Sequence, residues 1–497
     1  MRLLLFLLLQ ATLLGHLVGQ KQSSKLDAMI QQGVKDWNIP GLAAVVVHKG
    51  EVVFQKTYGV KDVGSGESVD NNTLFNMGST TKAIVAISIG MLVDQGKVQW
   101  DDKVRDHLPW FRLSDPYVTA DARVKDLLTH NLGSGNADLL WLLDSMSTRE
   151  TLEKFQLSER NYPLRGGFVY QNLMYAIAGE LIEAVSGQHW TVFVQKNVFE
   201  PLEMNRTQAK SADIFEAGNY AIPYHDDPDE GLVKVRHTLD DQIGAAGMIW
   251  SSAADISNYL RFLVSGGVFN GDTLITPVTF SYLFEPHSFV TKSGFYPTQQ
   301  LTNPNWTTYG LGWFQHDYRG SKLDFHTGSI TGLVAMAGIM HDKDLAVYVF
   351  SNLDHAELRH SILYKAIDLY AFDDNTRDWH KEIFELYSGL KERAKEATKK
   401  RDEARVANTN PTLNLDEYIG NYNHKMYGTA VVSIDKGKLK LVFNNHLTHS
   451  LSHWNYDTFI TNKEPDWRWE SLVKFNVGST GKIEELNVLG ETFTRTE

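Results

Sequence analysis

Short hydrophobic runs bounded by turn residues predict strands at both ends of the first 372 residues. Residues 42–47 are wholly apolar, and Lys49-Gly50-Glu51 predicts a hairpin turn back into a second strand over residues 52–57. Further strand patterns occupy residues 309–315, 322–326, 333–340 and 345–350. From about residue 79 to 270 the pattern is mainly helical. Strands at both ends of a helical region predict an α+β fold whose sheet joins those ends.

The pattern changes after residue 372. Residues 373–412 are rich in charges of both signs with helical spacing, which predicts a solvated connecting helix. Residues 413–497 then alternate short apolar strands with turns such as Asp435-Lys436-Gly437. We therefore expect a first domain over residues 21–372, a charged helical linker and a small C-terminal all-β domain, as a sheet or barrel.

The N-terminus has the pattern of an export signal. Arg2 precedes an almost wholly apolar run over residues 3–14, followed by small and polar residues up to residue 20. A run of about 12 residues is too short to span a bilayer, so residues 1–20 predict a secretory signal peptide, with an uncleaved anchor as the alternative. No later apolar run approaches membrane-spanning length. Three sequons predict glycosylation at Asn71, Asn205 and Asn305, as expected of a secreted protein.

The composition excludes several classes of function. The 497-residue chain is 42% hydrophobic, enough for a large core, and its net charge of −12 argues against nucleic-acid binding. Because it has no cysteine, disulfides and thiolate nucleophiles are excluded. His446, His449 and His453 are clustered, but they fall in strand and turn patterns, and the acidic loop 225–230 lacks calcium-loop spacing. We expect neither a metal nor a cofactor.

A serine and a lysine at the start of a buried helix are the first candidates for chemistry. Ser79 and Lys82 lie one helical turn apart on one face, and apolar residues follow on nearly every side up to Gly96. A lysine in such a core is costly unless it is paired or deprotonated, and it could activate the serine hydroxyl. The same Ser-x-x-Lys spacing occurs in charged or polar segments at Ser388, Ser433, Ser471 and Ser479, where chance explains it. A helix cap with a nearby lysine is the alternative for Ser79.

Two further motifs add polar groups. Tyr170-Gln171-Asn172 contains the one Tyr-x-Asn triplet in the chain, in a segment that a loop could project into a cleft. His326-Thr327-Gly328 lies at the end of a strand pattern, and Ser329 follows it. Lys292-Ser293-Gly294 is a rival for this last motif, but its neighbours do not continue as a strand.

In this order the motifs resemble the serine β-lactamase and penicillin-binding-protein superfamily. The resemblance is greatest to the class C β-lactamase-related enzymes, including LACTB-like hydrolases, D-aminopeptidases and esterases. It extends to residues 127–135 (LLTHNLGSG) and 244–252 (GAAGMIWSS) and covers about residues 25–372. It implies a β-lactamase/transpeptidase-like fold, with an antiparallel sheet and a helical domain. The tail resembles the lipocalin-like β-domain of some members.

The resemblance also implies roles for individual residues. Ser79 would be the nucleophile of an acyl-enzyme, with Lys82 and Tyr170 sharing the acid and base work. Asn172 would position Lys82 and a substrate amide, and His326 and Thr327 would line the substrate edge. Backbone N–H groups of Ser79 and Ser329 would form the oxyanion hole.

One departure concerns the substrate. Many family members have lysine in the place of His326, whereas histidine is largely neutral at pH 7 and titrates between about pH 5 and 8. Binding of a substrate carboxylate is therefore in doubt. His130 in the LLTHNLGSG segment is expected to brace its loop.

Two classes of function remain open at this point. The first is a secreted, extracellular serine hydrolase acting on a small peptide-like amide or an ester. The second is a secreted acidic structural protein, associated with the extracellular matrix, that kept the fold with little turnover. The three intact residues Ser79, Lys82 and Tyr170 favour the first.

Overall fold

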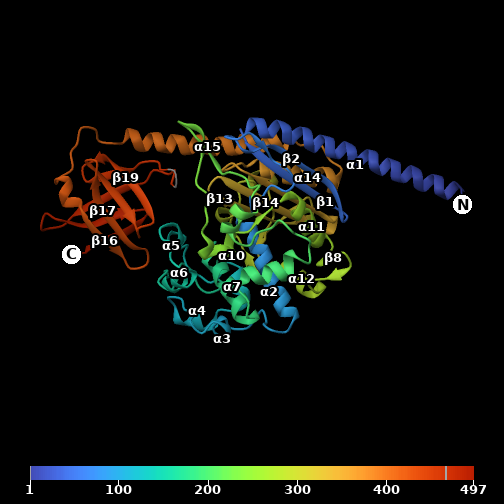
Figure 1. The fold of residues 1–497 in the computed structure, drawn as a ribbon, viewed down its shortest axis with the longest axis horizontal. Coiled ribbons are helices and arrows are strands. Elements are labelled where there is room, and N and C mark those ends of the chain that lie inside the picture. The colour runs from blue at the N-terminus through green and yellow to red at the C-terminus, as the bar shows by residue number, and fades with distance from the viewer. Residues whose placement is uncertain (1, 465–466, 497) are drawn as a thin grey trace. The chain divides into compact units, whose positions relative to one another are not determined.

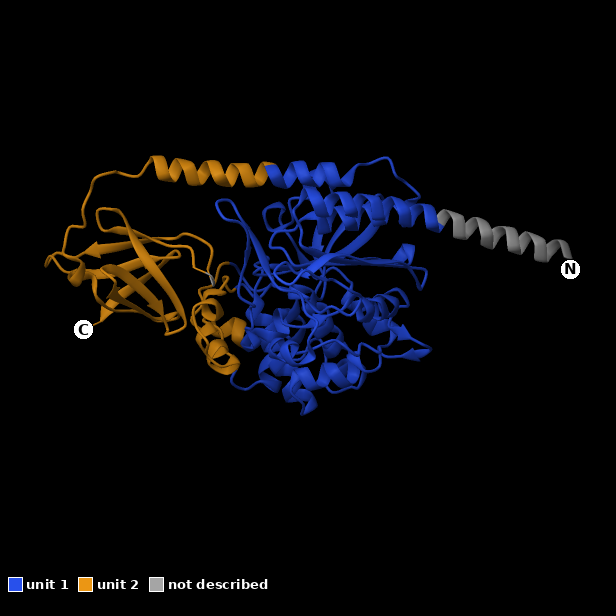
Figure 2. Cartoon of the chain, turned by 45° about the horizontal axis from the view of Figure 1, so that its top comes forward, with its two compact units in different colours: residues 1–110, 120–133, 162–388 blue, residues 111–119, 134–161, 389–497 orange. Residues whose placement is uncertain are grey.

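The chain divides into two units in a computed structural model that describes residues 2–464 and 467–496, the side chains of residues 2–18 excepted. Unit 1 comprises residues 1–110, 120–133 and 162–388, and unit 2 comprises residues 111–119, 134–161 and 389–497 (Figure 2). The side chains of the predicted signal peptide thus lie almost wholly outside the described part, and that prediction stays open. In the described part of the chain, no helix is long and apolar enough to cross a bilayer.

A nine-stranded antiparallel sheet forms the centre of unit 1 (Figure 1). Its order is β10-β11-β12-β13-β14-β15-β1-β2-β3, so the N-terminal hairpin pairs with the last strand of the unit. The predicted α+β fold and the hairpin at residues 49–50 are both confirmed. The strands are β1 (Gly41–His48), β2 (Glu51–Asp62), β3 (Glu67–Ser68), β10 (Ser288–Phe289), β11 (Thr307–Tyr309), β12 (Phe314–Tyr318), β13 (Ser321–Ile330), β14 (Leu333–Met340) and β15 (Leu345–Ser351).

Strand β14 and residues 345–350 of β15 form unbroken apolar runs because both faces of the sheet are covered there. In β15, Val347 and Val349 belong to the core that includes Leu363 of helix α14 (Leu358–Phe372). Tyr348 points the other way, and its hydroxyl shares a hydrogen bond of 2.5 Å with Thr80 Oγ1. Successive side chains of a strand alternate between faces, so a sheet buried on both sides needs an unbroken apolar run.

The helices of unit 1 surround this sheet. Helices α1 and α14 contact each other, α14 also packs on β14 and β15, and α11 packs on β1 and β15. The helices of unit 1 are α1 (Arg2–Asp36), α2 (Thr81–Asp94), α3 (Val104–His107), α7 (Asn172–Ser186), α8 (Trp190–Val194), α9 (Ile214–Ala217), α10 (Gly244–Gly247), α11 (Ala253–Val264), α12 (Pro277–Leu283), α13 (Gln299–Thr302) and α14 (Leu358–Phe372).

One predicted strand is wrong in its extent. Residues 309–315 do not form a single strand, because β11 ends at Tyr309 and β12 begins at Phe314. Between them Gly312 adopts a φ of +88°, and a Cβ there would lie 3.0 Å from the backbone of Ala83 in α2. The chain therefore turns where it passes the helix that follows Ser79, and a turn of this kind requires glycine.

Unit 2 contains a closed eight-stranded antiparallel barrel, which confirms the predicted all-β tail. The strands are β16 (Gly420–His424), β17 (Gly428–Asp435), β18 (Lys438–Phe443), β19 (Leu447–Asn455), β20 (Thr458–Thr461), β21 (Leu472–Val477), β22 (Ile483–Val488) and β23 (Glu491–Thr496). The sequence pattern missed β16, β19 and β23. In β23 only Phe493 is buried, since a barrel strand needs apolar residues on its inner face alone.

Smaller elements complete the chain. Unit 2 also holds α5 (Leu139–Leu142) and α6 (Thr148–Phe155), α4 (Pro116–Asp121) crosses a unit boundary, and the predicted charged linker contains α15 (Trp379–Glu403). Three strand pairs lie in unit 1, namely β4 (Phe75–Asn76) with β7 (Trp250–Ser251), β5 (Tyr224–Asp227) with β6 (Gly231–Lys234), and β8 (Val268–Phe269) with β9 (Asp272–Thr273). The acidic loop 225–230 is therefore part of a short hairpin.

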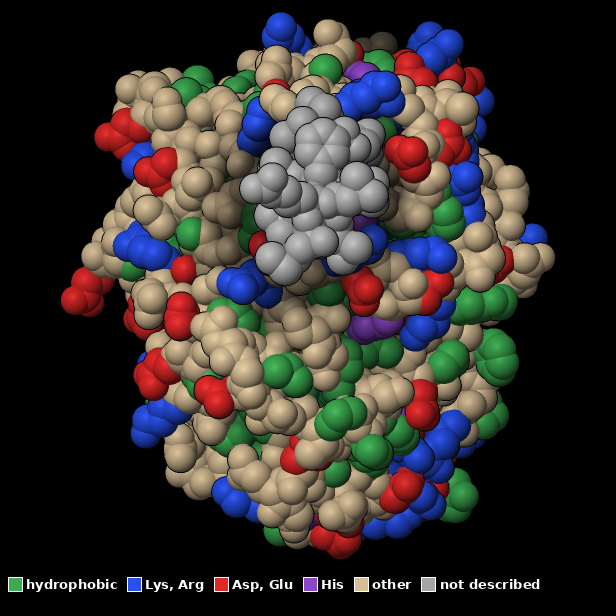
Figure 3. Space-filling model, turned by 90° about the vertical axis from the view of Figure 1, so that its right-hand side faces the viewer, with side chains coloured by type: hydrophobic (Ala, Val, Ile, Leu, Met, Phe, Trp, Pro, Cys, Tyr) green, Lys and Arg blue, Asp and Glu red, His purple; other side chains and the backbone are tan. Residues whose placement is uncertain are grey.

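Charges of both signs are interspersed on the face of the molecule shown in Figure 3. Basic and acidic side chains are neighbours over much of that view. A continuous basic surface, which nucleic-acid binding requires, is not present on that face.

Candidate active site

Ser79 lies in a rigid turn at the start of α2. The 3₁₀ turn η1 (Gly78–Thr80) leads directly into the helix, and Ser79 itself is partly exposed. Asn76 Oδ1 accepts a hydrogen bond from the Gly78 N–H at 2.6 Å, and Thr80 Oγ1 donates to the Met77 carbonyl at 2.8 Å. These local bonds fix the backbone on both sides of the serine, which itself stays partly exposed.

Lys82 is fully buried one turn further on, with a side chain that reaches back to Ser79. Its Nζ donates to Ser79 Oγ at 3.0 Å, to Asn172 Oδ1 at 2.8 Å and to the Ala246 carbonyl at 2.7 Å. Three acceptors satisfy the three N–H bonds of an ammonium group, which explains how a cation is retained in this core. The Ala246 carbonyl is a hydrogen-bond acceptor of Lys82 that the sequence analysis did not identify. The run of small residues at 244–247 is the signal that could have pointed to such a close approach.

The end of strand β13 approaches the Ser79 turn backbone to backbone. A Cβ on Gly328 would lie 2.0 Å from the Met77 carbonyl, and one on Gly78 would lie 2.6 Å from the Ser329 amide nitrogen. Gly78 also has a φ of +51°. Both positions therefore exclude a side chain, and the amide of Ser329 lies beside the turn that carries the nucleophile.

Tyr170 lies in a loop of residues 162–171 that ends at α7. Asn172 is the first residue of that helix, and Gln171 caps it by accepting from the Leu173 N–H. The Lys82 ammonium lies 4.9 Å from the centre of the Tyr170 ring. The structure thus brings Ser79, Lys82, Tyr170 and Asn172 together from segments about 90 residues apart.

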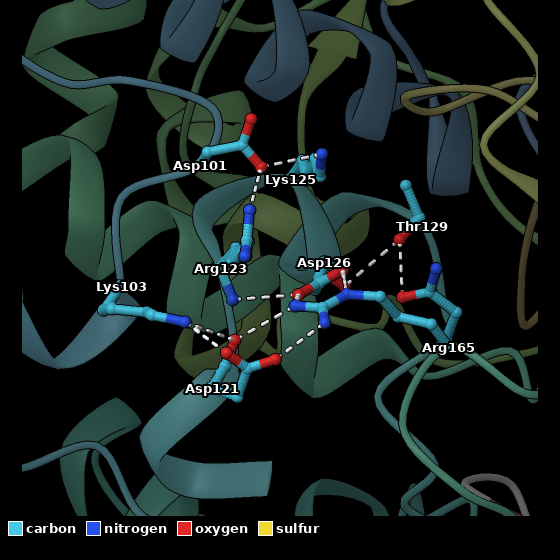
Figure 4. Close-up of polar contacts among 9 residues, drawn as sticks. Asp101, Lys103, Asp121, Arg123, Lys125, Asp126, Thr129 and Arg165 are labelled. Carbon is cyan, nitrogen blue, oxygen red and sulfur yellow. Dashed lines mark hydrogen bonds and ion pairs between the residues drawn. The ribbon is translucent and has the colours of Figure 1, made fainter.

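Arg165 attaches the Tyr170 loop to a neighbouring loop of unit 1. Figure 4 shows its guanidinium between the carboxylates of Asp121 and Asp126. Nε and Nη2 donate to the two oxygens of Asp126 at 3.0 and 2.5 Å, and Nη1 donates to Asp121 Oδ2 at 2.8 Å. The Arg165 N–H also donates to the Asn131 carbonyl at 2.8 Å. A forked contact of this kind has little freedom to rotate, so it fixes the course of the loop.

His130 holds the same loop from within. Its Nδ1 accepts from the Gln171 N–H at 3.1 Å, and its carbonyl accepts from the Val169 N–H and the Tyr162 hydroxyl. The imidazole ring lies 4.3 Å from the Tyr170 ring, measured between centroids. Burial, with added repulsion from Lys82, holds the pKa of His130 well below its usual range. These contacts are those of a neutral bracing histidine.

His326 is buried rather than open to solvent. Its ring is 1% exposed, and burial together with the Lys82 charge lowers its pKa to about 3. Nδ1 donates to the Thr327 carbonyl at 2.6 Å, so in the neutral ring Nε2 accepts from the Tyr309 hydroxyl at 3.1 Å. The expectation that this histidine titrates between pH 5 and 8 is therefore wrong, because protonation would place a second cation beside Lys82.

Thr327 and Ser329 follow His326 in β13, where successive side chains point to opposite faces of the sheet. Thr327 Oγ1 shares a hydrogen bond of 2.7 Å with the Tyr296 hydroxyl, and Ser329 Oγ accepts from Arg359 Nη1 at 3.0 Å. Arg359 also donates to the Gly328 carbonyl at 2.7 Å. Sequence reasoning missed both Tyr296 and Arg359, because neither lies in a recognisable motif and both reach the strand from other elements.

The remaining predicted positions lie away from this cluster. The glycosylation candidates Asn71, Asn205 and Asn305 are exposed. Within residues 2–464 and 467–496 there is no group of three or more potential metal-ligating side chains. The histidines of the tail have separate surroundings, since His449 is buried while His446 is exposed.

Comparisons with known proteins agree with this geometry. Residues 26–372 match the Beta-lactamase family, and residues 404–495 match a domain of unknown function, DUF3471. The chain is 27% identical over 447 residues to the "Unguisins hydrolase ungD" of Aspergillus violaceofuscus, covering 83% of this chain and 76% of that protein. It is 30% identical over 223 residues to "Esterase EstB" of Burkholderia gladioli, covering 41% and 55%.

Among solved structures, the fold is similar to that of an octameric penicillin-binding protein homologue from Pyrococcus abyssi. The TM-score is 0.63 at 20% sequence identity, and the match covers 95% of this chain and 98% of that one. The family match spans more than half of the chain and includes every residue of the Ser79 cluster. This chain therefore belongs to the β-lactamase-like family of serine hydrolases.

Proposed function

We propose that the protein is a secreted serine hydrolase that cleaves an amide or ester through an acyl-enzyme on Ser79. The observation that carries this proposal is the 3.0 Å hydrogen bond between the buried Lys82 ammonium and the partly exposed Ser79 hydroxyl. A structural role alone gives no reason to bury a cation against a serine that is only partly covered.

The proposed reaction has two steps. Ser79 Oγ attacks the substrate carbonyl carbon while its proton passes to Tyr170, acting as a phenolate beside Lys82. The amides of Ser79 and Ser329 stabilise the oxyanion, and the C–N or C–O bond breaks as the leaving group takes up that proton. Water then attacks the acyl carbon and gives a proton to the same base. The bond between the acyl carbon and Ser79 Oγ breaks, and Oγ takes that proton back, which releases the acid and restores Ser79. Lys82, held by three acceptors, supplies the positive charge throughout.

The substrate class follows from the site and from the relatives. The hydrolase and esterase named above support a small peptide-like amide or an ester as substrate. Residues 1–20 and the three exposed asparagines Asn71, Asn205 and Asn305 support secretion and glycosylation. A structural extracellular protein that binds without turnover remains the competing proposal, favoured only by the acidic composition.

Intact-mass analysis of chain secreted by eukaryotic cells, after removal of glycans, tests the proposal. Incubation with a fluorophosphonate should add one probe mass to a chain that begins near residue 21. The adduct should be absent from Ser79→Ala, and Lys82→Ala should react at least about 10²-fold more slowly. An adduct that persists in Ser79→Ala would refute Ser79 as the nucleophile.

A further inference from the structure

Three side chains at the end of β13 have the chemistry to hold a substrate carboxylate. They are the His326 imidazole, the Thr327 hydroxyl and the Arg359 guanidinium. His326 and Thr327 directly precede Gly328 in β13, and Arg359 of α14 donates to the Gly328 carbonyl at 2.7 Å. Lys82 is already held by Ser79, Asn172 and Ala246, so these three side chains are the further donors that a substrate carboxylate beside β13 could use. A buried carboxylate must be paired or hydrogen-bonded.

The Thr327 hydroxyl is already bound by Tyr296. The two hydroxyls are 2.7 Å apart, and the Tyr296 ring is fixed by Phe314 and Phe325, whose ring centroids lie 5.0 and 5.1 Å away. His360 of α14 contacts the same ring from another side at 5.6 Å. With its ring held in this way, Tyr296 keeps its hydroxyl on Thr327.

The other two groups are occupied as well. His326 donates through Nδ1 to a backbone carbonyl and accepts through Nε2 from Tyr309, so it has no N–H left for a ligand. Arg359 is paired with Glu357, with Nε 3.1 Å from Oε2 and Nη2 3.3 Å from Oε1. Burial raises the pKa of Glu357, but the Arg359 charge together with hydrogen bonds from His355 and His360 outweighs burial and holds that pKa well below its usual range. The pair is therefore ionised and adds no net charge.

We infer that Tyr296 is a specificity-determining residue. It restricts this hydrolase to substrates whose acyl group carries no carboxylate where that group lies beside β13. It does so by accepting the one O–H bond of Thr327, which then has no proton left for a carboxylate, while Tyr309 binds His326 and Glu357 pairs with Arg359. This inference rests on the proposed function, because it describes how substrate meets the Ser79 site. It narrows the substrate class to neutral esters and amides.

Arylboronic acids test the inference without requiring turnover. Boron accepts a lone pair from Ser79 Oγ to form a B–O bond, the serine proton passes to the general base, and no group leaves. The dissociation constants of phenylboronic acid and 3-carboxyphenylboronic acid would be measured by calorimetry on the full chain. The neutral compound should bind the wild type more tightly, by about fivefold or more.

Tyr296→Phe keeps the ring and releases the Thr327 hydroxyl. It should tighten the carboxylate compound at least about fivefold and change the neutral one less than about twofold. The gain should disappear in Tyr296→Phe/Thr327→Val. Tyr364→Phe is the matched control, because it removes a buried hydroxyl bound to His316 in the same unit at 3.2 Å and should keep the wild-type ratio. Thermal unfolding of both Phe variants confirms that each is folded.

The outcomes separate this inference from the function on which it rests. If the ratio of the two dissociation constants were unchanged in folded Tyr296→Phe, the role of Tyr296 would be overturned but the proposed function would stand. The same would follow if the wild type bound the carboxylate compound more tightly than the neutral one. Thr327→Val in the wild-type background should shift both compounds alike, and a selective loss of the carboxylate compound would also overturn it. If the wild type bound neither compound, or Ser79→Ala bound both equally well, the proposed nucleophile and this inference would fail together.

Discussion

At the scale of single residues, the site is defined by which groups carry charge and which are kept neutral. Lys82 is a buried cation with three acceptors, and two histidines within the same aromatic cluster are held neutral by burial and by that cation. Neutral His130 and His326 can each accept one hydrogen bond, and each uses that capacity on the protein itself. The cluster therefore concentrates its positive charge at the nucleophile.

His326 should make the protein less stable in acid without controlling its activity near neutrality. Its folded pKa of about 3 lies below the ordinary value of 6.5, so between these pH values the unfolded chain binds more protons. The free energy of unfolding should therefore fall as pH falls from about 6.5. Going from pH 6.5 to 4.5, His326→Gln should lose about 2 kcal/mol less than the wild type.

Urea denaturation at several pH values measures this difference. Probe acylation between pH 5 and 8 should show the same midpoint in both proteins, with Tyr309→Phe as a control for loss of the histidine's partner. A midpoint that moves in His326→Gln would mean that the imidazole titrates in the site after all.

At the scale of elements, the catalytic candidates depend on two loops that brace each other. The loop 162–171 carries Tyr170, and the loop 121–131 supplies Asp121, Asp126 and the His130 carbonyl that hold it. Asp126 is 1% exposed, and its Oδ2 also accepts from the Arg123 N–H at 2.9 Å. One carboxylate thus joins the start of the 3₁₀ turn η2 (Val124–Leu128) to the Tyr170 loop.

Arg165→Met should slow acylation of Ser79 at least about 10-fold while the protein stays folded. The substitution removes the fork to Asp126 and Asp121, and a misplacement of about 1 Å in a catalytic group is enough to cost far more than this. It also leaves Asp126 buried without its guanidinium, so stability should fall by about 1–3 kcal/mol. Stopped-flow labelling well below the unfolding temperature measures the rate.

The matched control is Arg123→Met, which removes another arginine of the same network. The Arg123 guanidinium pairs with Asp101 at 2.7 Å, so this change should leave the labelling rate within about twofold. Equal rates in the two variants would show that the Arg165 contact has no part in placing Tyr170.

At the scale of the whole molecule, the site residues and the barrel belong to different units. Every member of the Ser79 cluster lies in unit 1, whereas the barrel strands all follow Asn408 in unit 2. The segment before the barrel is exposed over residues 391–400 and carries i,i+4 ion pairs such as Lys400 with Glu396. This is the composition of a helix stabilised by water and local charge pairs rather than by a core.

A chain that ends at Asn408 should stay soluble and still label at Ser79. The contacts given above for Ser79 and Lys82 are all to residues of unit 1, so this chain keeps them. Its rate with small neutral esters should therefore stay within about threefold of the full-length rate. Selectivity among larger peptides should broaden if the barrel limits access. Circular dichroism and intact-mass labelling make the comparison. Loss of labelling in a folded truncated chain would mean that the tail supplies part of the active site.

The order of the main elements and the candidates Ser79, Lys82 and Tyr170 can be predicted from the sequence alone. Unbroken apolar runs such as residues 333–340 and 345–350 predict strands buried on both faces, and the position of Ser79 before a buried helix marks it among five Ser-x-x-Lys matches. These features are local, so they can be read from neighbouring residues. Three of the eight barrel strands, β16, β19 and β23, and the turn at Gly312 are not predicted, because their patterns depend on the elements that they pack against.

The electrostatics of the site and the specificity inferred for it depend on contacts that form only in the folded protein. The neutral state of His326, the forked contact of Arg165 and the bond between Tyr296 and Thr327 join residues from different elements. A pKa depends on burial and on charges brought near by folding, and a hydroxyl is free or occupied according to its neighbours in space. Neither property is written in the residues beside His326 or Thr327 in the chain.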